Sequence, residues 1–439
     1  MEQQLTTGKI GRSLILFSLP MILGNLLQQL YNVADTLIVG QTIGATALSA
    51  VGSSYALMVL LTSIILGLCM GSSVVFAQLY GAKKIDDLKT SIFNSFVFIL
   101  IISAIINVFA FALLDKFILW INIPSQAVAL TRTYLKIIFI GMTFVSIYNF
   151  FASILRSIGN TVVPLIFLGV SALTNIILDL ILILVFHLGV AGAALATVIS
   201  QGLSAICITI YFFKKSKNLC PNKKHIHFNK RLLKLIINNS TLTAIQQSIM
   251  NLGILMVQGL VNSFGFATSA AFAAVVKIDA FAYMPAQDFG NAFSTFVAQN
   301  YGAKKSKRIK DGTFIAMIIS SLFCLCSSAL VYIFSKPLML MFVNPGEHEI
   351  INIGIQYLHI EGVFYIGIGI LFLLYGVFRG LGKSGISILL TVISLGSRVL
   401  LAYALSSIST IGVIGIWWSV PIGWALADII GLLIYKKYK

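Results

Sequence analysis

The chain has 439 residues, of which 58% are apolar and only 10% are charged, whereas about a quarter of the residues in an ordinary soluble domain are charged. A water-soluble protein of this length could not keep so much apolar surface away from water, so the composition excludes a soluble globular protein and indicates a membrane protein. The net charge of +17 raises the possibility of a nucleic-acid partner, which depends on where the basic residues lie.

Cutting the sequence at its charged loops predicts twelve apolar spans, each long enough for a helix to cross a hydrocarbon core of roughly 30 Å. They run over 14–40, 46–80, 90–115, 127–155, 161–187, 190–213, 235–263, 267–301, 312–335, 349–378, 386–408 and 411–435. We therefore predict an all-α integral membrane protein with twelve transmembrane helices in two six-helix bundles. The predicted domains are an N-lobe over 1–213, a basic cytoplasmic linker over 214–234 and a C-lobe over 235–439. His225 and His227 lie in this linker, where we expect them to be solvated.

Lysine and arginine residues gather in the termini and in alternate loops. Eight lie between 214 and 234, and further pairs are Lys83 with Lys84 and Lys304 with Lys305. This is the positive-inside pattern of cytoplasmic loops. It predicts a multi-pass protein of the cell (plasma) membrane with both termini in the cytoplasm. Because topology accounts for the basic charge, we expect no nucleic-acid partner.

The two halves of the sequence repeat one another. The stretch Ala77-Gln-Leu-Tyr-Gly-Ala-Lys-Lys84 recurs 221 positions later as Ala298-Gln-Asn-Tyr-Gly-Ala-Lys-Lys305, with seven of eight residues identical. Arg156-Ser-Ile-Gly159 recurs 223 positions later as Arg379-Gly-Leu-Gly382. An even number of helices per copy gives both copies the same orientation. The repeat thus predicts two bundles related by a pseudo-two-fold axis along the membrane normal, with substrate bound between them.

Six carboxylic acids lie inside the predicted spans, where a charged side chain costs about 2.5–3.5 kcal/mol on insertion scales. They are Asp35, Asp179, Asp279, Asp288, Glu361 and Asp428. This cost makes intramembrane carboxylates candidates for function. The alternative for each is a structural ion pair or a place near a helix end.

Asp35 and Asp179 form the sharpest candidate site. Both fall in the outer half of an outward-running helix, so they are expected at similar depth within the first bundle. Asn175 precedes Asp179 by four residues, which places the amide and the carboxylate on one helix face. Two carboxylates that approach closely away from water favour a shared proton or a cation bound to their oxygens. Either event couples an ion to a conformational change.

The repeat provides an internal comparison for this site. The second-half counterparts of Asp35 and Asp179 are Met256 and Ala402. Residues needed only by the scaffold would more often persist in both copies, so the comparison favours a function confined to the first half.

Glu361 and Arg398 lie at mid-depth on consecutive predicted helices of the second half. We predict that they form a structural ion pair, because a buried charge requires a partner. A contact with substrate is the alternative.

The first and seventh predicted helices each carry polar residues along one side, which predicts that they line the cavity between the halves. The cavity-lining candidates are Gln28, Tyr31, Asn32, Gln246, Asn251, Gln258, Asp279 and Asp288. Pro20 lies inside the first helix, where proline removes a backbone hydrogen bond and kinks the chain. It could act as a hinge when Asp35 changes state, or it could form a static kink.

These residues together resemble the multidrug and toxin extrusion (MATE) family over the whole chain. The resemblance rests on the stretch Val33-Ala-Asp-Thr-Leu-Ile-Val-Gly40, on the paired Gln-x-Tyr-Gly-Ala motifs and on Leu155-Arg-Ser-Ile-Gly-Asn160. It is closest to the prokaryotic branch that has a cation site in the amino-terminal lobe. The matching positions for that site are Asp35, Asn149, Asn175, Asp179 and Thr197.

The resemblance implies export of small, often cationic or amphipathic compounds in exchange for inward H⁺ or Na⁺, by a chain that functions as a monomer in membrane lipid. A flippase for a lipid-linked saccharide or another amphipathic lipid precursor is the alternative within transport. No ATP-binding G-x-x-x-x-G-K-[ST] motif is present, so primary transport is not indicated.

An intramembrane enzyme is the alternative from another class of protein. It would need clustered His, Glu or Ser–Lys chemistry, which the sequence lacks. The five cysteines form no C-x-x-C pair and have no histidine at ligand spacing, so they predict no metal or redox site. We therefore expect no catalysis, no cofactor and no resident metal, with H⁺ or Na⁺ as the coupling ion.

Overall fold

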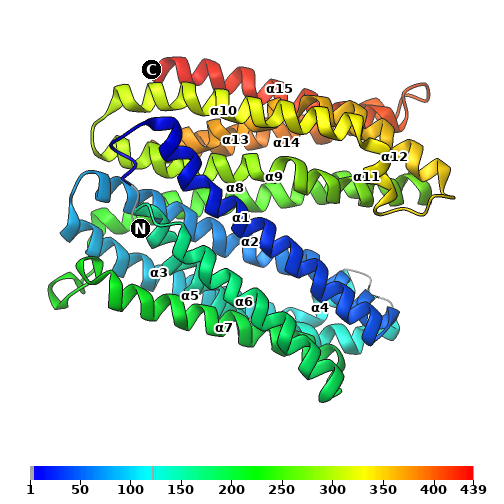
Figure 1. Cartoon of the computed structure of the whole chain (residues 1–439), viewed down its shortest axis with the longest axis horizontal. Coiled ribbons are helices and arrows are strands. Elements are labelled where there is room, and N and C mark those ends of the chain that lie inside the picture. The colour runs from blue at the N-terminus through cyan, green and yellow to red at the C-terminus, as the bar shows by residue number, and fades with distance from the viewer. Residues whose placement is uncertain (1–3, 121–122, 124, 439) are drawn as a thin grey trace. The chain divides into compact units, whose positions relative to one another are not determined.

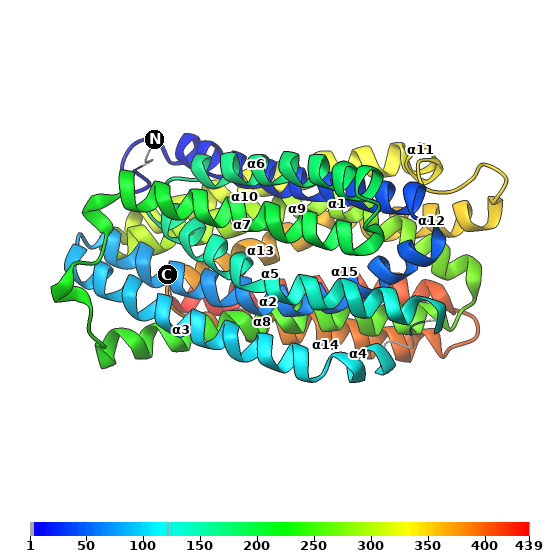
Figure 2. The same cartoon turned by 90° about the horizontal axis from the view of Figure 1, so that it is seen from below.

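The computed structural model describes residues 4–120, 123 and 125–438. Across these residues the chain is helical and holds no β-strand, and twelve helical segments are long and apolar enough to cross a membrane. This confirms the predicted all-α membrane fold (Figures 1 and 2). The α-helices are α1 Ile10–Thr42, α2 Ala45–Gly81, α3 Ile85–Ala112, α4 Leu114–Trp120, α5 Ser125–Ser157, α6 Val162–Leu180, α7 Gly189–Lys215, α8 Lys230–Asn262, α9 Phe266–Gly302, α10 Ser306–Ile333, α11 Ser335–Leu340, α12 His348–Glu361, α13 Tyr365–Gly380, α14 Ser384–Ser406 and α15 Val413–Tyr438.

Two of the spans are interrupted by a short change of helix type. A π-helical segment, η1 Ile181–Val185, follows α6 directly, and a 3₁₀ segment, η4 Gly362–Phe364, joins α12 to α13. The other 3₁₀ segments, η2 Lys217–Leu219 and η3 Lys223–His225, lie in the linker. Such irregular turns inside long helices are frequent at functional sites. Sequence periodicity did not indicate either interruption.

The chain divides into two compact units. Unit 1 contains Leu23–Ala244, and unit 2 contains Gln4–Ile22 together with the chain from Ile245 onward. Compared with the lobes predicted from the sequence, the first part of α1 lies in the second unit and the first part of α8 lies in the first unit. The two changes of unit fall at repeat-related positions, after Ile22 and after Ala244. Hydrophobic patterning cannot show this exchange, because it reports that a helix is buried but not against which partner.

In unit 1, α5 packs against α2, α3 and α7, and α6 packs against α7. The first part of α8 approaches α2 closely: a Cβ atom added at Gly71 would overlap the backbone of Asn239 and Ser240. Beside this contact, the Ser72 and Ser240 hydroxyls are hydrogen-bonded at 2.8 Å. Small residues that let two backbones approach are typical of helix contacts in membranes.

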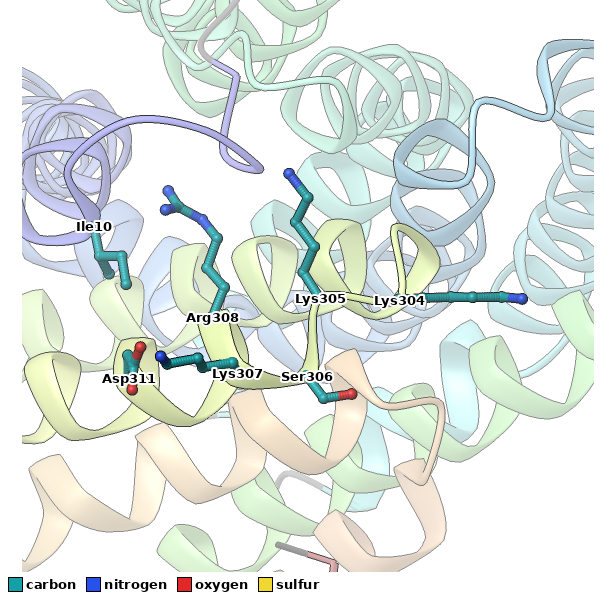
Figure 3. Close-up of a pocket in the computed structure, with 7 residues that line it drawn as sticks. All are labelled: Ile10, Lys304, Lys305, Ser306, Lys307, Arg308 and Asp311. Carbon is teal, nitrogen blue, oxygen red and sulfur yellow. The ribbon is translucent and has the colours of Figure 1, made fainter.

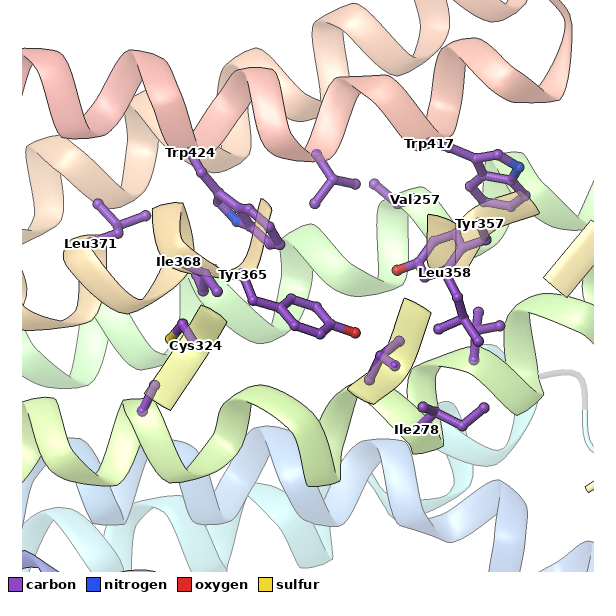
Figure 4. Packing of buried hydrophobic residues seen from close by; sticks show 14 of the residues in the cluster. Val257, Ile278, Cys324, Tyr357, Leu358, Tyr365, Ile368, Leu371, Trp417 and Trp424 are labelled. Atoms are coloured by element: carbon purple, nitrogen blue, oxygen red, sulfur yellow. The ribbon is translucent and has the colours of Figure 1, made fainter. Parts of the chain in front are cut away.

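In unit 2, α13 packs against α9 and α10, and α14 packs against α15. The first part of α1 joins this unit through Leu14 and Phe17, which are fully buried in a cluster with Phe293 and Phe296 of α9. A second cluster of buried side chains from α9, α12, α13 and α15 includes Tyr357 and Trp417 (Figure 4). Helix α1 therefore begins against unit 2 and ends within unit 1.

The linker packs on unit 1, which corrects one expectation. His225 is buried, with only 3% of its surface exposed, whereas His227 is exposed as expected. The His225 Nδ1 accepts the Asn222 backbone N–H at 3.0 Å, so its Nε2 donates to Asp86 on α3 at 2.9 Å. Lys224 also contacts Asp86, at 3.2 Å. The imidazole thus fixes the linker to the first turn of α3.

Candidate ion-coupling site

Asp35 of α1 and Asp179 of α6 lie close enough in unit 1 for their carboxyl groups to interact electrostatically. Asp179 is fully buried and lies on the last turn of α6, directly before the π-helical segment η1. Two carboxylates have no hydrogen to donate, so they can hydrogen-bond to one another only when one of them carries a proton. The two carboxyl groups predicted at similar depth are therefore neighbours in unit 1, and their role in ion coupling stays a prediction.

Four buried oxygens of this site have no hydrogen-bond donor in the described structure. They are Asp35 Oδ1, Asp179 Oδ1, Asp179 Oδ2 and Asn175 Oδ1. Buried polar atoms without a partner are rare, because each costs about 1–3 kcal/mol. Oxygen atoms without donors are the ligands that a proton or a hard cation takes. The site is therefore suited to binding one positive ion.

The Asn175 amide is oriented by the neighbouring helix. Its Nδ2 donates to the Thr197 hydroxyl of α7 at 3.4 Å, while its Oδ1 remains without a donor. The predicted residues Asn175, Asp179 and Thr197 are thus brought together with Asp35. Asn149 is different: its amide donates to the Val145 carbonyl of its own helix at 2.9 Å, and its part in the site stays a prediction.

Two tyrosines, Tyr31 and Tyr134, lie near the pair. The sequence analysis named Tyr31 as a cavity-lining candidate and did not name Tyr134. Tyr31 lies one turn before Asp35, and the buried Tyr134 comes from α5; both lie within electrostatic range of Asp35 and Asp179. Tyr134 was missed because it lies among Thr131, Arg132, Thr133 and Lys136 near the start of α5, so the sequence does not show that it faces the carboxylates of α1 and α6. The available signal was its hydroxyl, which a buried tyrosine must place near a partner.

Unit 2 holds a second polar cluster, around Asp279 of α9. The Tyr357 hydroxyl donates to Asp279 Oδ2 at 2.9 Å, and the Tyr365 hydroxyl donates to Asp279 Oδ1. These tyrosines flank the 3₁₀ break between α12 and α13, and Figure 4 shows both hydroxyls among buried apolar side chains. Sequence reasoning named Asp279 but not its donors.

The predicted ion pair between Glu361 and Arg398 is not formed as a direct contact. The ion pairs within 4 Å in the described residues are Arg132–Asp115, Lys224–Asp86 and His225–Asp86. Glu361 Oε2 and Arg398 Nε are both buried without a hydrogen-bond partner. The guanidinium instead acts at longer range on both Asp279 and Glu361. One guanidinium therefore serves two buried carboxyl groups, which the sequence did not indicate.

The remaining cavity-lining candidates make mostly local contacts within their own helices. Asn32 donates to Gln29 at 3.4 Å, Asn251 to the Gln247 carbonyl at 3.2 Å and Gln258 to Asn262 at 2.8 Å. The Gln246 amide instead donates to the Thr391 hydroxyl of α14 at 3.1 Å. Gln28 is exposed and Asp288 is buried. Whether they line a substrate cavity stays a prediction.

The sequence model of the MatE family matches residues 20–181 and again residues 243–404. The chain belongs to the MatE family. Because the two matches are 223 positions apart, they also confirm the internal repeat. This MATE chain is therefore a multi-pass member of a family of multidrug-efflux transporters, as its sequence resemblance indicated.

Among its relatives, this MATE chain is 30% identical to "Probable multidrug resistance protein YpnP" of Bacillus subtilis, over 89% of the chain and 86% of that protein. It is 28% identical to "Probable multidrug resistance protein NorM" of Thermotoga maritima, over 93% of the chain and 88% of that protein. None of these relatives is named as a lipid flippase, so the alternative within transport gains no support.

Solved structures share the fold. A MOP-superfamily transporter from Pyrococcus furiosus has a TM-score of 0.93 and 23% identity, covering 100% of this chain and 97% of that one. An outward-facing MATE family transporter has a TM-score of 0.94 and 23% identity, with coverage of 100% and 97%. At this identity the likeness concerns the fold alone.

Proposed function

We propose that this MATE chain is a secondary active antiporter that exports small, often cationic or amphipathic compounds in exchange for inward H⁺ or Na⁺. It works by alternating access, as a monomer in the cell membrane, and carries out no catalysis and uses no cofactor. The observation that supports ion coupling most directly is the Asp35–Asp179 pair with its four buried oxygens that lack donors. The names of the relatives support the substrate class.

The chemistry of the pair gives the coupling step. With no ion bound, two neighbouring carboxylates repel one another in a buried site. A proton between them, or a sodium ion on their oxygens and on Asn175 Oδ1, removes this repulsion and lets α1 approach α6. Release of the ion restores the repulsion and separates the two helices. The bound and free states therefore differ in the position of α1 relative to α6.

Helix α1 can carry that difference to the second unit. Its part that holds Asp35 belongs to unit 1, whereas its first part, up to Ile22, belongs to unit 2. Pro20 lies two residues before this change of unit. The missing backbone hydrogen bond at the proline lowers the resistance of the helix to bending. We assign Pro20 as the hinge through which ion binding changes which side of the membrane the substrate site faces.

The experiment is dye transport in proteoliposomes with one gradient imposed at a time. A pH gradient alone, a sodium gradient alone and no gradient are compared at equal protein density. Uphill dye movement with one of the two gradients supports the proposal and names the ion. Equal dye movement under all three conditions contradicts it. Asp115→Asn serves as the matched control, because Asp115 is an exposed carboxylate of unit 1 that pairs with Arg132.

A further inference from the structure

A basic pocket of about 480 Å³ lies in unit 2, at the turn between α9 and α10. We call it the α9–α10 basic pocket. Its lining residues are Ile10, Lys304, Lys305, Ser306, Lys307, Arg308 and Asp311 (Figure 3). Four of them are basic and one is acidic, so the pocket carries an excess of positive charge. The ion-coupling chemistry proposed above uses none of these residues.

Two of the basic side chains are held in place by the N-terminal segment. The Arg308 guanidinium donates to the Leu5, Thr7 and Gly8 carbonyls at 3.2, 2.6 and 2.8 Å, and Lys305 Nζ donates to the Thr6 carbonyl at 2.9 Å. Figure 3 shows both side chains pointing to the same side of the turn. Carbonyl groups are neutral, so these bonds fix the geometry of the cations without cancelling their charge. Such preorganisation reduces the entropy lost when an anion binds.

The backbone adds to the positive potential. Helix α10 begins at Ser306 and has 28 residues, and its N-cap residue Lys305 makes no side-chain capping bond. The first N–H groups of a helix have no partner within it, and the helix dipole gives that end partial positive charge. Phosphate groups bind at such helix ends. Side chains and backbone therefore both favour an anion.

The position of the pocket indicates a lipid anion. It lies in the turn between the spans Phe266–Gly302 and Ser306–Ile333, and the turn between two membrane spans lies near the bilayer surface. Along α10 below it, Phe314, Ile318 and Leu322 form an exposed apolar row at helical spacing. Helix α1 meets α10 here, since a Cβ at Gly11 would contact Ile315. An acyl chain could extend along this row while its headgroup occupies the pocket.

The internal repeat shows that the basic pocket is specific to unit 2. The counterparts of Lys307 and Arg308 in unit 1 are Asp86 and Asp87, so the charge at these positions is reversed. Asp86 is engaged by Lys224 and His225 of the linker. The repeated fold therefore does not require basic residues at this turn.

We propose that the α9–α10 basic pocket binds the phosphate-bearing headgroup of an anionic phospholipid, with its acyl chains against α10. Basic pockets between transmembrane helices bind such headgroups. The lipid then bridges the start of α1 and the start of α10. This site is separate from the ion-coupling site and does not depend on which ion drives transport.

The test is native mass spectrometry of the purified full-length protein in mixed micelles of phosphatidylglycerol and phosphatidylcholine. The variant Lys304→Gln/Lys307→Gln removes two charges from the pocket and leaves the Arg308 and Lys305 bonds to the N-terminal segment intact. The matched control, Lys83→Gln/Lys84→Gln, removes the same charge from the equivalent turn of unit 1. Each basic residue near an anionic surface contributes about fivefold in affinity. We therefore expect phosphatidylglycerol binding to fall about 30-fold in the pocket variant and to remain at the wild-type level in the control.

Three outcomes overturn the proposal. The first is equal retention of phosphatidylglycerol and phosphatidylcholine by the wild type. The second is an equal loss in the pocket variant and in the control, which would indicate general charge attraction. The third is full competition by excess inorganic phosphate, which would show that the pocket binds free phosphate rather than lipid. Melting temperatures in phosphatidylcholine alone verify that all variants are folded.

Discussion

The Asn175 amide nitrogen donates to the Thr197 hydroxyl at 3.4 Å, across the contact between α6 and α7. This bond decides which end of the amide faces the carboxylates. Because Nδ2 donates to Thr197, the other end of the amide is the oxygen Asn175 Oδ1, which is buried and accepts no hydrogen bond from the described residues. Thr197 thereby determines that Asn175 offers an oxygen, and not an NH₂ group, to an ion at the carboxylates.

Replacing Thr197 with valine tests this arrangement. Valine keeps the shape of the side chain but removes the acceptor, so the amide can rotate and offer its NH₂ group to the ion. Since one hydrogen bond contributes about 1 kcal/mol net, we expect the ion concentration for half-maximal efflux to rise about fivefold, with the maximal rate unchanged. Initial dye-efflux rates across an ion titration provide the measurement. Thr197→Ser should restore the wild-type value, and an unchanged ion dependence in Thr197→Val would refute the orienting role.

Close packing between α2 and the first part of α8 gives a second prediction. A Cβ at Gly71 would overlap the backbone of Asn239 and Ser240, whereas one at Gly52 on the same helix has nothing within 4 Å. Overpacking typically costs about 1–3 kcal/mol, so Gly71→Ala should lower the melting temperature in detergent. Gly52→Ala should leave it unchanged or raise it slightly, because alanine favours helix. Equal melting temperatures in the two variants would argue against a tight α2–α8 contact.

The hydrogen bonds on Asp279 give a third prediction. Tyr357→Phe and Tyr365→Phe each remove a donor to this buried carboxyl group. Hydrogen bonds to charged groups contribute about 1.5–3 kcal/mol. The free energy of unfolding should therefore fall by about this amount in each single variant and by more in the double variant. Thermal unfolding monitored by tryptophan fluorescence measures this. Tyr403→Phe is the control, because Tyr403 is exposed; an equally large effect there would show that the loss is not specific to Asp279.

Much of this architecture was predictable because it depends on local composition. The twelve spans follow from hydropathy, and the Asp35–Asp179 pair follows from topology and equal depth. The donors to Asp279 were not predictable, since Tyr357 and Tyr365 are far from it in sequence and only tertiary packing brings them together. The same holds for the Arg308 contacts with the N-terminal segment. The direct Glu361–Arg398 contact is not formed, and the fold places Asp279 near the same guanidinium, which the linear sequence could not show.

Membrane orientation gives a fourth prediction, measured by cysteine labelling. In a cysteine-less background, Asn222→Cys should react with an impermeant maleimide only from the cytoplasmic side and Gly346→Cys only from outside. A second background that keeps Cys220 as its single cysteine offers a pH test in the same loop, because burial raises the pKa of the Cys220 thiol. The thiolate is the reactive form, so Cys220 should label more slowly near neutral pH than the thiol of the Asn222→Cys variant and should accelerate as the pH rises. Labelling of position 346 from the inside would invert the assigned topology.

The last prediction concerns the carboxylate pair itself. Asp35→Asn and Asp179→Asn each remove a charge that is costly within the bilayer, so folding and insertion should remain intact. The remaining carboxylate no longer faces a like charge, and the site loses the repulsion that ion binding relieves. Gradient-driven dye efflux should therefore fall to the level of empty liposomes in both variants. Equilibrium dye binding in detergent should stay within about twofold of the wild type, because neither substitution changes a contact that the proposal assigns to the dye. Asp115→Asn should behave as the wild type in both assays. Loss of dye binding together with efflux would place Asp35 and Asp179 in the substrate site, and wild-type efflux in Asp35→Asn would remove the pair from the coupling mechanism.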